Sequence, residues 1–470
     1  MVLQGLQPER VFYWFETLCG IPHGSGNTKE ISDFCVEFAI EHGLRCSQDV
    51  WNNVVIRKPA SVGYEEHPPV ILQGHLDMVC EKDEGVAIDF TKDGLTLRVE
   101  GDWISADGTT LGGDDGIAVA MALAILEDDT LAHPPLEVLF TTDEETGMYG
   151  AAGLDPTDIK GRTLINVDSE QEGTLTVGCA GGARVDVGLP LRRETAEGPC
   201  VQIVIDGLQG GHSGVEIHKG RQNANKLMGE LLRQLPEGWQ LVSLSGGQKD
   251  NAIPRLARAQ VLCHGDVAAV AAAFAAAKRV DTDPGLQVTV TPAGRAAQAL
   301  SAADSRRAAA LLCALPDGVQ AYSRDIEGLV ETSLNLGILR LDADGLHASF
   351  AVRSGINREK DALLHRLQAV ATAHGAIAEP GGAYPAWEYR ADSPLRDVMV
   401  DTYRQLTGKA PTVEIIHAGL ECGLLSDKLP GLDAVSCGPD MQDIHTSRER
   451  LSISSTARTY QYLCRVLERL

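Results

Sequence analysis

The chain has 470 residues, more than a typical single domain contains, so its length predicts two domains and allows three. Its 41 basic and 65 acidic residues give a net charge of −24, which would repel phosphate backbones and anionic membranes and argues against nucleic-acid binding. Hydrophobic residues make up 44% and charged residues 23%, a balance typical of a folded globular protein and not of a disordered chain.

The cysteines and the first residues favour a reducing compartment. Eleven cysteines are scattered from Cys19 to Cys464 without a C-x-x-C pair, so we expect free thiols and neither a disulfide framework nor a zinc ribbon. Met1 to Arg10 lacks the apolar run of a secretion signal. The longest strongly apolar stretch, Ile117 to Leu126, is about half of a membrane span. The sequence therefore predicts a cytoplasmic protein with no membrane partner.

In chain order, the first part of the chain alternates between helical and strand patterns. A helix is expected from the N-cap Asn27 to Ala39, because apolar residues recur with helical spacing before Gly43. Gly116 to Leu126 is apolar almost all round and is long enough for a buried helix. Short aliphatic runs indicate buried strands at Val54–Ile56, Val70–Leu72, Leu136–Phe140 and Leu164–Val167. This alternation predicts an α/β fold with a mostly parallel sheet covered by helices.

The middle of the chain has a different pattern, in which strands pair with helices on one side. Strands are expected at Val201–Ile205, Leu286–Val290, Leu329–Leu339 and Leu346–Arg353. Helices are expected at Asn223–Gln234, Val267–Lys278, Ala303–Leu315 and Arg358–His374. This pattern is typical of an α+β domain.

The ends of this middle segment predict a discontinuous domain. Composition shifts at Cys179–Gly182, and Gly381–Pro385 has the composition of a linker that returns the chain to its first pattern. After it, a helix at Leu395–Leu406, a strand at Thr412–Ile416 and a helix at Ser452–Leu470 restore the α/β alternation. We therefore expect one α/β domain formed by residues 1–181 and 385–470, with an α+β domain of residues 182–384 inserted into it.

Polar clusters follow the predicted strands or precede the apolar helix. They are Gly74-His75-Leu76-Asp77, Gly112-Gly113-Asp114-Asp115-Gly116, Asp143-Glu144-Glu145 and Asp168. In an open α/β sheet, ligands bind at the carboxyl edge of the strands, so these clusters should converge in one crevice.

Each cluster alone also has an ordinary structural interpretation. His75 and Asp77 could form a polar strand end, and Asp114-Asp115 could cap a helix. Glu144 and Glu145 could lie in a solvated loop, although a bound cation is an economical reason to keep two adjacent carboxylates after an apolar strand. His445 by itself is more often a loop histidine than a ligand.

Taken together, these residues predict a metal centre. The set of His75, Asp114, Glu145, Asp168 and His445 has the mixed nitrogen and oxygen donors that suit zinc. Two divalent cations would be neutralised by three carboxylates and one hydroxide, with one carboxylate bridging. Such a pair would lower the pKa of a shared water toward neutrality, and Glu144 would remain free as a general base.

Seven motifs stand out along the chain: GHLDM from Gly74, LGGDDGIAVAMAL from Leu111, TTDEETG from Thr141, NVDSE from Asn166, GGHSG from Gly210, NAIPR from Asn251 and IHTSRE from Ile444. They resemble the motifs of the dizinc aminoacylase and carboxypeptidase family, and most of all those of its aminoacyl-histidine dipeptidases. They occur in family order from residue 74 to residue 449, so the resemblance covers essentially the whole chain.

The resemblance implies a role for each ligand candidate. His75 and Asp168 would hold one zinc, Glu145 and His445 the other, and Asp114 would bridge the two ions. It also implies that Asp77 orients His75 and that Glu144 is the general base and acid. Manganese or cobalt are possible substitutes for zinc. The family has Asn where this chain has Asp115, which leaves the choice of Asp114 over Asp115 as the bridge open.

The inserted domain contributes further candidates. The resemblance implies that His212 reaches the active site of a partner subunit and helps to hold the oxyanion. The inserted domain would then be a lid and would form the contact of a homodimer. The alternative is that His212 is an incidental residue of a glycine turn. Arg353 could bind the substrate carboxylate or form a surface salt bridge. Asn251 and Asn335 are weaker candidates for substrate contacts, and Glu421 has no assigned role.

The resemblance therefore implies a dizinc dipeptidase of broad specificity, including Xaa-His substrates such as carnosine. An N-acyl-amino-acid deacylase remains an alternative, because the same metals attack any amide and the pocket selects the substrate. A catalytically silent metal-binding protein is a third possibility, which the presence of Glu144 disfavours.

Overall fold

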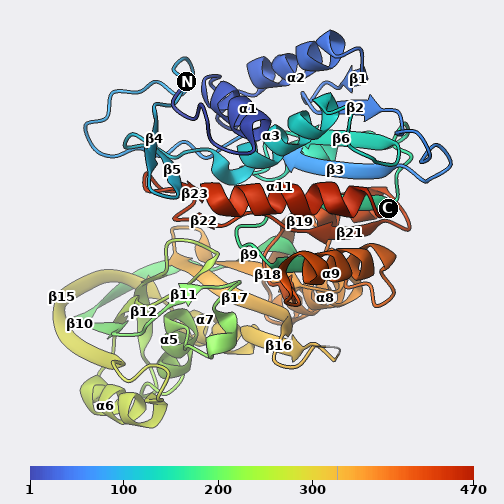
Figure 1. Ribbon diagram of the computed structural model, residues 1–470. Helices are drawn as coiled ribbons and strands as arrows, with labels where there is room; N and C mark the ends of the chain where they lie inside the picture. The colour runs from blue at the N-terminus through green and yellow to red at the C-terminus, as the bar shows by residue number, and fades with distance from the viewer. Residues whose placement is uncertain (325) are drawn as a thin grey trace. The chain divides into compact units, whose positions relative to one another are not determined.

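The computed structural model describes residues 1–324 and 326–470 and contains two compact units. Unit 1 comprises Met1–Gly178, Tyr389–Ile415 and Leu420–Leu470, and unit 2 comprises Cys179–Glu388 and Ile416–Gly419. Figure 1 shows the helices and strands of each unit along the chain.

Unit 1 is built on an eight-stranded sheet with the order β1-β2-β6-β3-β7-β21-β8-β20. Its four central strands, β6, β3, β7 and β21, are parallel, whereas β1 and β2 pair antiparallel at one side and β8 pairs antiparallel with β21 at the other. The strands span Arg45–Gln48 (β1), Val54–Lys58 (β2), Val70–His75 (β3), Leu136–Thr141 (β6), Thr163–Asn166 (β7), Thr174–Cys179 (β8), Thr412–Ile416 (β20) and Asp433–Ser436 (β21).

Helices cover both faces of this sheet. Gly74 of β3 faces Ala118 of the buried helix α3, whereas the side chain of the preceding residue, Gln73, contacts Glu421 of α10. Successive strand residues point to opposite faces, so α3 and α10 lie on opposite sides. The helices span Glu9–Cys19 (α1), Lys29–Glu41 (α2), Gly113–Glu127 (α3), Tyr149–Gly153 (α4), Pro394–Thr407 (α9), Glu421–Lys428 (α10) and Ile453–Leu467 (α11).

The core of unit 1 centres on α3, in which every residue from Gly113 to Leu126 is buried. This burial explains why the sequence of α3 is apolar on all sides. A separate four-stranded sheet with the order β22-β23-β5-β4 carries the loop between β22 and β23 that contains His445. Its strands are Leu97–Glu100 (β4), Trp103–Ala106 (β5), Met441–Gln442 (β22) and Arg450–Ser452 (β23).

Unit 2 is a nine-stranded sheet with helices packed on one face. The sheet order is β15-β10-β14-β12-β17-β18-β9-β19, and β16 also pairs with β17. In β9, Val185, Val187 and Leu189 are buried in a core shared with the helices, while Arg184 and Asp186 on the other face are exposed. The helices are Ala224–Leu232 (α5), Val267–Lys278 (α6), Ala302–Ala314 (α7) and Asn357–Ala373 (α8).

The strands of the unit 2 sheet pair antiparallel, and β10 and β15 each have 14 residues. They span Gly181–Pro190 (β9), Arg193–Asp206 (β10), Gln240–Gly246 (β12), Ala257–Leu262 (β14), Gln287–Leu300 (β15), Gly318–Tyr322 (β16), Val330–Leu341 (β17), Gly345–Ser354 (β18) and Ile377–Tyr384 (β19), and a separate short pair is formed by Gly211–His212 (β11) and Ala252–Ile253 (β13).

The predicted α/β fold class, with a parallel sheet covered by helices and a second α+β part, is confirmed. Two local expectations were wrong. The linker expected at Gly381–Pro385 is largely the end of β19, which pairs with β9 through Tyr384. The strand expected to end at Val290 continues to Leu300. Both β19 and β15 are edge strands, where glycine and proline are tolerated because one side of the strand needs no partner.

Two chemical expectations can also be compared with the structure. All eleven cysteines are free thiols, as expected. No helix within residues 1–324 and 326–470 is both long enough and apolar enough to span a bilayer.

Candidate metal centre

Three neighbouring parallel strands bring the predicted ligands to one edge of the unit 1 sheet. β3 ends at His75, β6 leads into Glu144 and Glu145, and β7 leads into Asp168. β3 pairs in parallel with both β6 and β7, with His75 opposite Thr141 and Gln73 opposite Asn166. Because the carboxyl ends of parallel strands share an edge, side chains separated by tens of residues lie together.

Asp114 lies between the two imidazoles. Its Oδ1 is 3.1 Å from His75 Nε2, and its Oδ2 is 3.2 Å from His445 Nε2. Asp114 thus contacts each imidazole through a different carboxylate oxygen. The two histidines contact the same carboxylate, so they lie within the roughly 10 Å that a dinuclear site permits.

The remaining candidate ligands complete the cluster. His445 Nε2 is 2.8 Å from Glu145 Oε1, and His75 Nε2 is 3.9 Å from Asp168 Oδ1. Ligand atoms of His75, Asp114 and Glu145 all lie within 4.8 Å of one another. The side chain of His75 is 1% exposed and that of His445 is 46% exposed, so the cluster opens toward solvent at His445.

The cluster is strongly charged. Burial lowers the pKa of His75, but its contacts with Asp114 and Asp77 outweigh this effect and raise the pKa well above its usual value. The contacts with Asp114 and Glu145 raise the pKa of His445 to about 10. The carboxylates that stabilise positive charge on the imidazoles would attract divalent cations in the same way, and the nitrogen and oxygen donors fit zinc.

Asp77 holds both His75 and the loop after β6. Its backbone carbonyl accepts from His75 Nδ1 at 3.0 Å, and its carboxylate lies 3.5 Å from the same nitrogen. The carboxylate also accepts the backbone N–H of Glu144 at 3.1 Å and the hydroxyl of Ser25 at 2.8 Å. A hydrogen bond to Nδ1 leaves Nε2 of His75 as the atom that can bind a metal.

Asp115 is directed at the backbone of β3. Its Oδ2 accepts the backbone N–H of His75 at 3.1 Å, and its Oδ1 is buried without a hydrogen-bond partner within the described part of the chain. Burial raises the pKa of Asp115 well above its usual value. Ligand atoms of Asp115, His75 and Asp168 also lie within 4.8 Å of one another, but Asp114 is the aspartate that contacts both imidazoles.

Glu144 and Glu145 differ in their surroundings. The Glu145 carboxylate contacts His445, whereas the hydrogen bond between Glu144 and Asp77 engages the backbone N–H of Glu144 and not its carboxylate. Burial raises the pKa of Glu144 to about 8. The positive charge of His75 lowers this pKa, whereas the nearby carboxylates of Glu421, Glu145 and Asp114 raise it further. A buried carboxyl group beside the ligands with an elevated pKa has the properties of a general base and acid.

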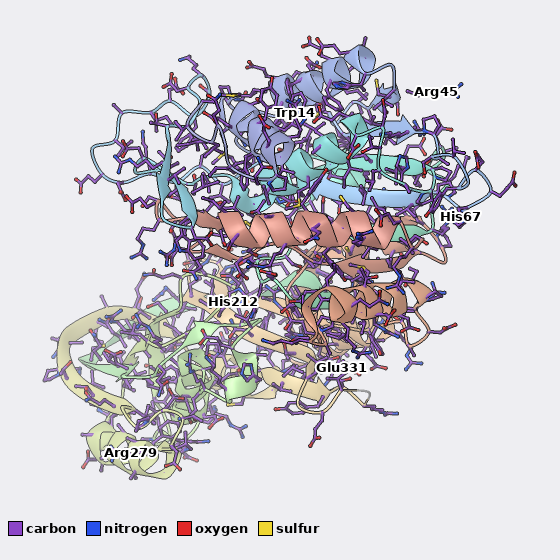
Figure 2. The ribbon with its side chains drawn as sticks, in the orientation of Figure 1. Trp14, Arg45, His67, His212, Arg279 and Glu331 are labelled. Atoms are coloured by element: carbon purple, nitrogen blue, oxygen red, sulfur yellow. The ribbon has the colours of Figure 1, made fainter. Side chains whose placement is uncertain are left out.

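Unit 2 contains a second cluster, which includes His212 (labelled in Figure 2) on β11 and Arg353 on β18. His212 Nδ1 accepts the backbone N–H groups of Gly214 and Val215, both at 3.2 Å, so Nε2 carries the proton and is a donor. Burial lowers the pKa of His212, and the charge of Arg353 lowers it further. The imidazole is therefore neutral near pH 7.

The guanidinium of Arg353 is only partly hydrogen-bonded. Its Nε is buried without a hydrogen-bond partner within residues 1–324 and 326–470, and its Nη1 lies 3.4 Å from the hydroxyl of Tyr384. His417 lies near it: burial lowers the pKa of His417 to about 4, with Arg353 contributing, and His417 Nε2 is 2.8 Å from Ser333 Oγ. A buried guanidinium N–H without a partner is a donor that an anion can satisfy.

The two asparagines of unit 2 differ. Asn251 is exposed, and its backbone carbonyl accepts from Ser213 at 2.8 Å. Asn335 is buried and donates to the carbonyls of Asp250 and Ala252 at 2.7 and 2.9 Å. Both N–H bonds of Asn335 are thus used, which favours a role in holding the Asn251 loop over the substrate contact expected from the sequence.

Sequence reasoning did not single out His417 and gave Glu421 no role. Glu421 is fully buried and accepts hydrogen bonds from Gln73 Nε2 at 2.7 Å and from Thr141 Oγ1 at 2.5 Å. Gln73 and Thr141 belong to β3 and β6, the strands that lead to the candidate ligands. Glu421 lies in the family-like motif Gly419–Gly423, but the motif does not give its role. The partners of Glu421 and His417 lie far away in the sequence, so local patterns do not reveal these contacts.

A sheet edge with two imidazoles, three carboxylates and an adjacent free glutamate is typical of a metal-dependent hydrolase. The model of peptidase family M20/M25/M40 matches residues 71–469, and the chain belongs to this family, which confirms the resemblance of its motifs.

Similar proteins agree with this assignment. The chain is 37% identical over 479 residues to the cytosol non-specific dipeptidase of Escherichia coli, covering 100% of this chain and 99% of the relative. The crystal structure of aminoacylhistidine dipeptidase from Vibrio alginolyticus matches with a TM-score of 0.94 at 36% identity, over 100% of this chain and 98% of that one. Aminopeptidase PepT from Bacillus cereus shares the fold, with a TM-score of 0.57 at 16% identity over 98% of both chains.

Proposed function

We propose that this chain is a dizinc dipeptidase of broad specificity that accepts Xaa-His substrates such as carnosine. The observation that carries this proposal is the position of Asp114 between His75 and His445, with Glu145 and Asp168 beside them. The dipeptidases of Escherichia coli and Vibrio alginolyticus, which match over the full chain, support the substrate class.

The ligand residues would hold two ions, with zinc the best fit and manganese or cobalt as substitutes. His75 and Asp168 would bind one ion, Glu145 and His445 the other, and Asp114 both. Bound ions would lower the pKa of a shared water and polarise the peptide carbonyl. Glu144 would take a proton from the attacking water and return it to the leaving amine.

Two residues of unit 2 would bind two different groups of the substrate, the reacting carbonyl oxygen and the terminal carboxylate. The free donor Nε2 of His212 suits an oxyanion, and the guanidinium of Arg353 suits the substrate carboxylate. The family resemblance implies that His212 reaches across a subunit boundary. We therefore propose a homodimer formed through residues 182–384, which would serve as lid and dimerisation domain. The name of the relative from Escherichia coli supports a cytoplasmic location.

A substrate panel on metal-depleted protein tests the function. Protein stripped with a chelator and supplied with zinc, manganese or cobalt should hydrolyse dipeptides such as Gly-His and carnosine, and activity should be lost without metal. The N-acetylated form of each dipeptide separates the two amide chemistries. Faster cleavage of the acetylated forms would replace the dipeptidase proposal with a deacylase, and zinc-loaded protein that cleaves neither would indicate a silent metal-binding protein.

A further inference from the structure

A single buried carboxylate collects the backbone N–H groups of four consecutive residues in unit 1. Glu449 is 3% exposed. Its Oε2 accepts from Leu111 at 2.8 Å and from Gly112 at 3.3 Å, and its Oε1 accepts from Gly113 at 2.8 Å and from Asp114 at 3.4 Å. The two oxygens of an ionised carboxylate offer about four lone pairs, which matches these four donors.

The segment that Glu449 holds leads directly to the bridging position. Asp114 and Asp115 at the start of α3 have non-helical backbone angles, so the N–H groups of this turn have no partner within the helix. A Cβ on Gly113 would lie 3.2 Å from Glu449 Oε1, a tight contact that glycine avoids. The glycines of this segment therefore permit the close approach of the carboxylate.

Glu449 also belongs to the loop that carries His445. It lies four residues after His445, between β22 and β23, and its backbone N–H donates to the carbonyl of Thr446 at 3.1 Å. One side chain thereby ties the loop of His445 to the segment of Asp114, although the two segments are more than 300 residues apart. Within the cluster, His445 Nε2 lies 3.2 Å from Asp114 Oδ2.

We propose that Glu449 is a positioning residue of the metal centre, which sets the distance between the Asp114 carboxylate and the His445 imidazole. This inference rests on the metal site of the proposed function. A neutral amide cannot replace Glu449, because glutamine has one acceptor oxygen and its NH₂ group would face the N–H donors. Loss of such a supporting contact typically weakens metal affinity or activity by about 10- to 100-fold.

The test compares Glu449→Gln with a matched control, Glu137→Gln. Glu137 is also buried and accepts backbone N–H groups, from Lys160 at 2.9 Å and Gly161 at 2.7 Å, but it lies near the start of β6, at the end remote from Glu144. The zinc affinity of each metal-depleted variant is measured by competition with a chromophoric chelator. The melting temperature without zinc reports on the loss of a buried hydrogen-bond acceptor in both variants.

We expect Glu449→Gln to bind zinc about 10- to 100-fold more weakly than wild type does. Glu137→Gln should bind zinc as tightly as wild type. The melting temperature of the metal-free protein should drop by a similar amount in both variants. Equal zinc affinity in Glu449→Gln and wild type would overturn the inference, as would equal weakening in both variants. Wild-type protein that binds no zinc would remove the proposed function and this inference together.

A measurement on the wild-type protein covers the case in which Glu449→Gln does not fold. Hydrogen exchange of the metal-free protein should be slow for the amides of Leu111–Asp114, because all four are buried donors to Glu449. Exchange of these amides as fast as that of exposed loops would contradict the proposed contact.

Discussion

Glu144 and Glu145 are adjacent in the chain, but their surroundings separate a proton carrier from a ligand. The Glu145 carboxylate is 2.8 Å from His445. The Glu144 backbone is fixed by Asp77 at 3.1 Å, while its carboxyl group is buried among like charges that raise its pKa. Replacing each residue in turn should therefore have different consequences.

Glu144→Ala should lower kcat by about 10²–10⁴-fold, because general acid–base catalysis contributes that much, and should leave zinc content unchanged. Glu145→Ala should lose zinc as well as activity, since it removes a contact of His445. Steady-state kinetics and elemental analysis of the purified variants measure both. Normal turnover or lost zinc in Glu144→Ala would refute its role as the base.

The lowered pKa of His417 predicts that the free energy of unfolding of unit 2 falls in acid. Burial and Arg353 hold its pKa at about 4, below the usual 6.5, so the unfolded state binds more protons between these values. The free energy of unfolding should therefore be unaffected above pH 6.5 and should fall as the pH drops toward 4, by about 2 kcal/mol at pH 5.

Urea unfolding at pH 7 and pH 5 measures this loss. In His417→Gln the difference between the two pH values should shrink, whereas in a control at the exposed His264, His264→Gln, it should remain that of wild type. An equal pH dependence in wild type and His417→Gln would show that His417 does not titrate in this way.

At the scale of the elements, the contact between β3 and α3 places the ligands. Gly74 precedes His75 and faces α3, where an added Cβ would lie 2.6 Å from Asp115 Oδ2 and 2.8 Å from Ala118 Cβ. Both neighbours are buried and α3 is packed on all sides, so neither has room to move. The approach of helix to strand therefore depends on the absence of a side chain at Gly74.

Gly74→Ala should destabilise the protein by about 1–3 kcal/mol, the usual cost of overpacking, and should weaken zinc binding because α3 carries Asp114. Gly188→Ala in β9 is the control, since a Cβ there meets nothing within 4 Å. Thermal unfolding and zinc titration compare the two variants. If Gly74→Ala were as stable as Gly188→Ala, the contact would be less tight than the distances indicate.

At the scale of the whole molecule, the chain divides its chemistry between two units. The candidate ligands and Glu144 belong to unit 1, and His212, Arg353 and His417 belong to unit 2. His417 lies in the short segment Ile416–Gly419, which belongs to unit 2 although unit 1 residues flank it on both sides. The candidate metal ligands and the groups proposed to bind the substrate are thus carried by different units.

Mixing two inactive variants tests whether His212 acts across subunits. If it does, a heterodimer of Glu144→Ala and His212→Ala has one intact site, so random exchange of subunits in a symmetric dimer should restore about a quarter of wild-type activity. The activity of the mixture is compared with that of each variant alone, and light scattering gives the oligomeric state. No gain on mixing of exchanged dimers would place His212 in the site of its own chain.

The sequence by itself determined the α/β class and which polar residues meet, because His75, Glu144, Glu145 and Asp168 each follow an apolar run and the ends of parallel strands share an edge. The sequence also specified α6, which spans Val267–Lys278 as expected, since its alanine-rich run has no competing strand signal.

Only the tertiary structure decided which of the two adjacent aspartates faces the histidines. Asp114 and Asp115 have the same chemistry, and their directions depend on backbone angles at the start of α3. The contacts of Glu449 and His417 were equally inaccessible, because their partners are backbone groups or side chains from distant segments. A pattern in sequence reports which face a residue shares with near neighbours, whereas the partner of a buried polar group is set by how separate segments pack.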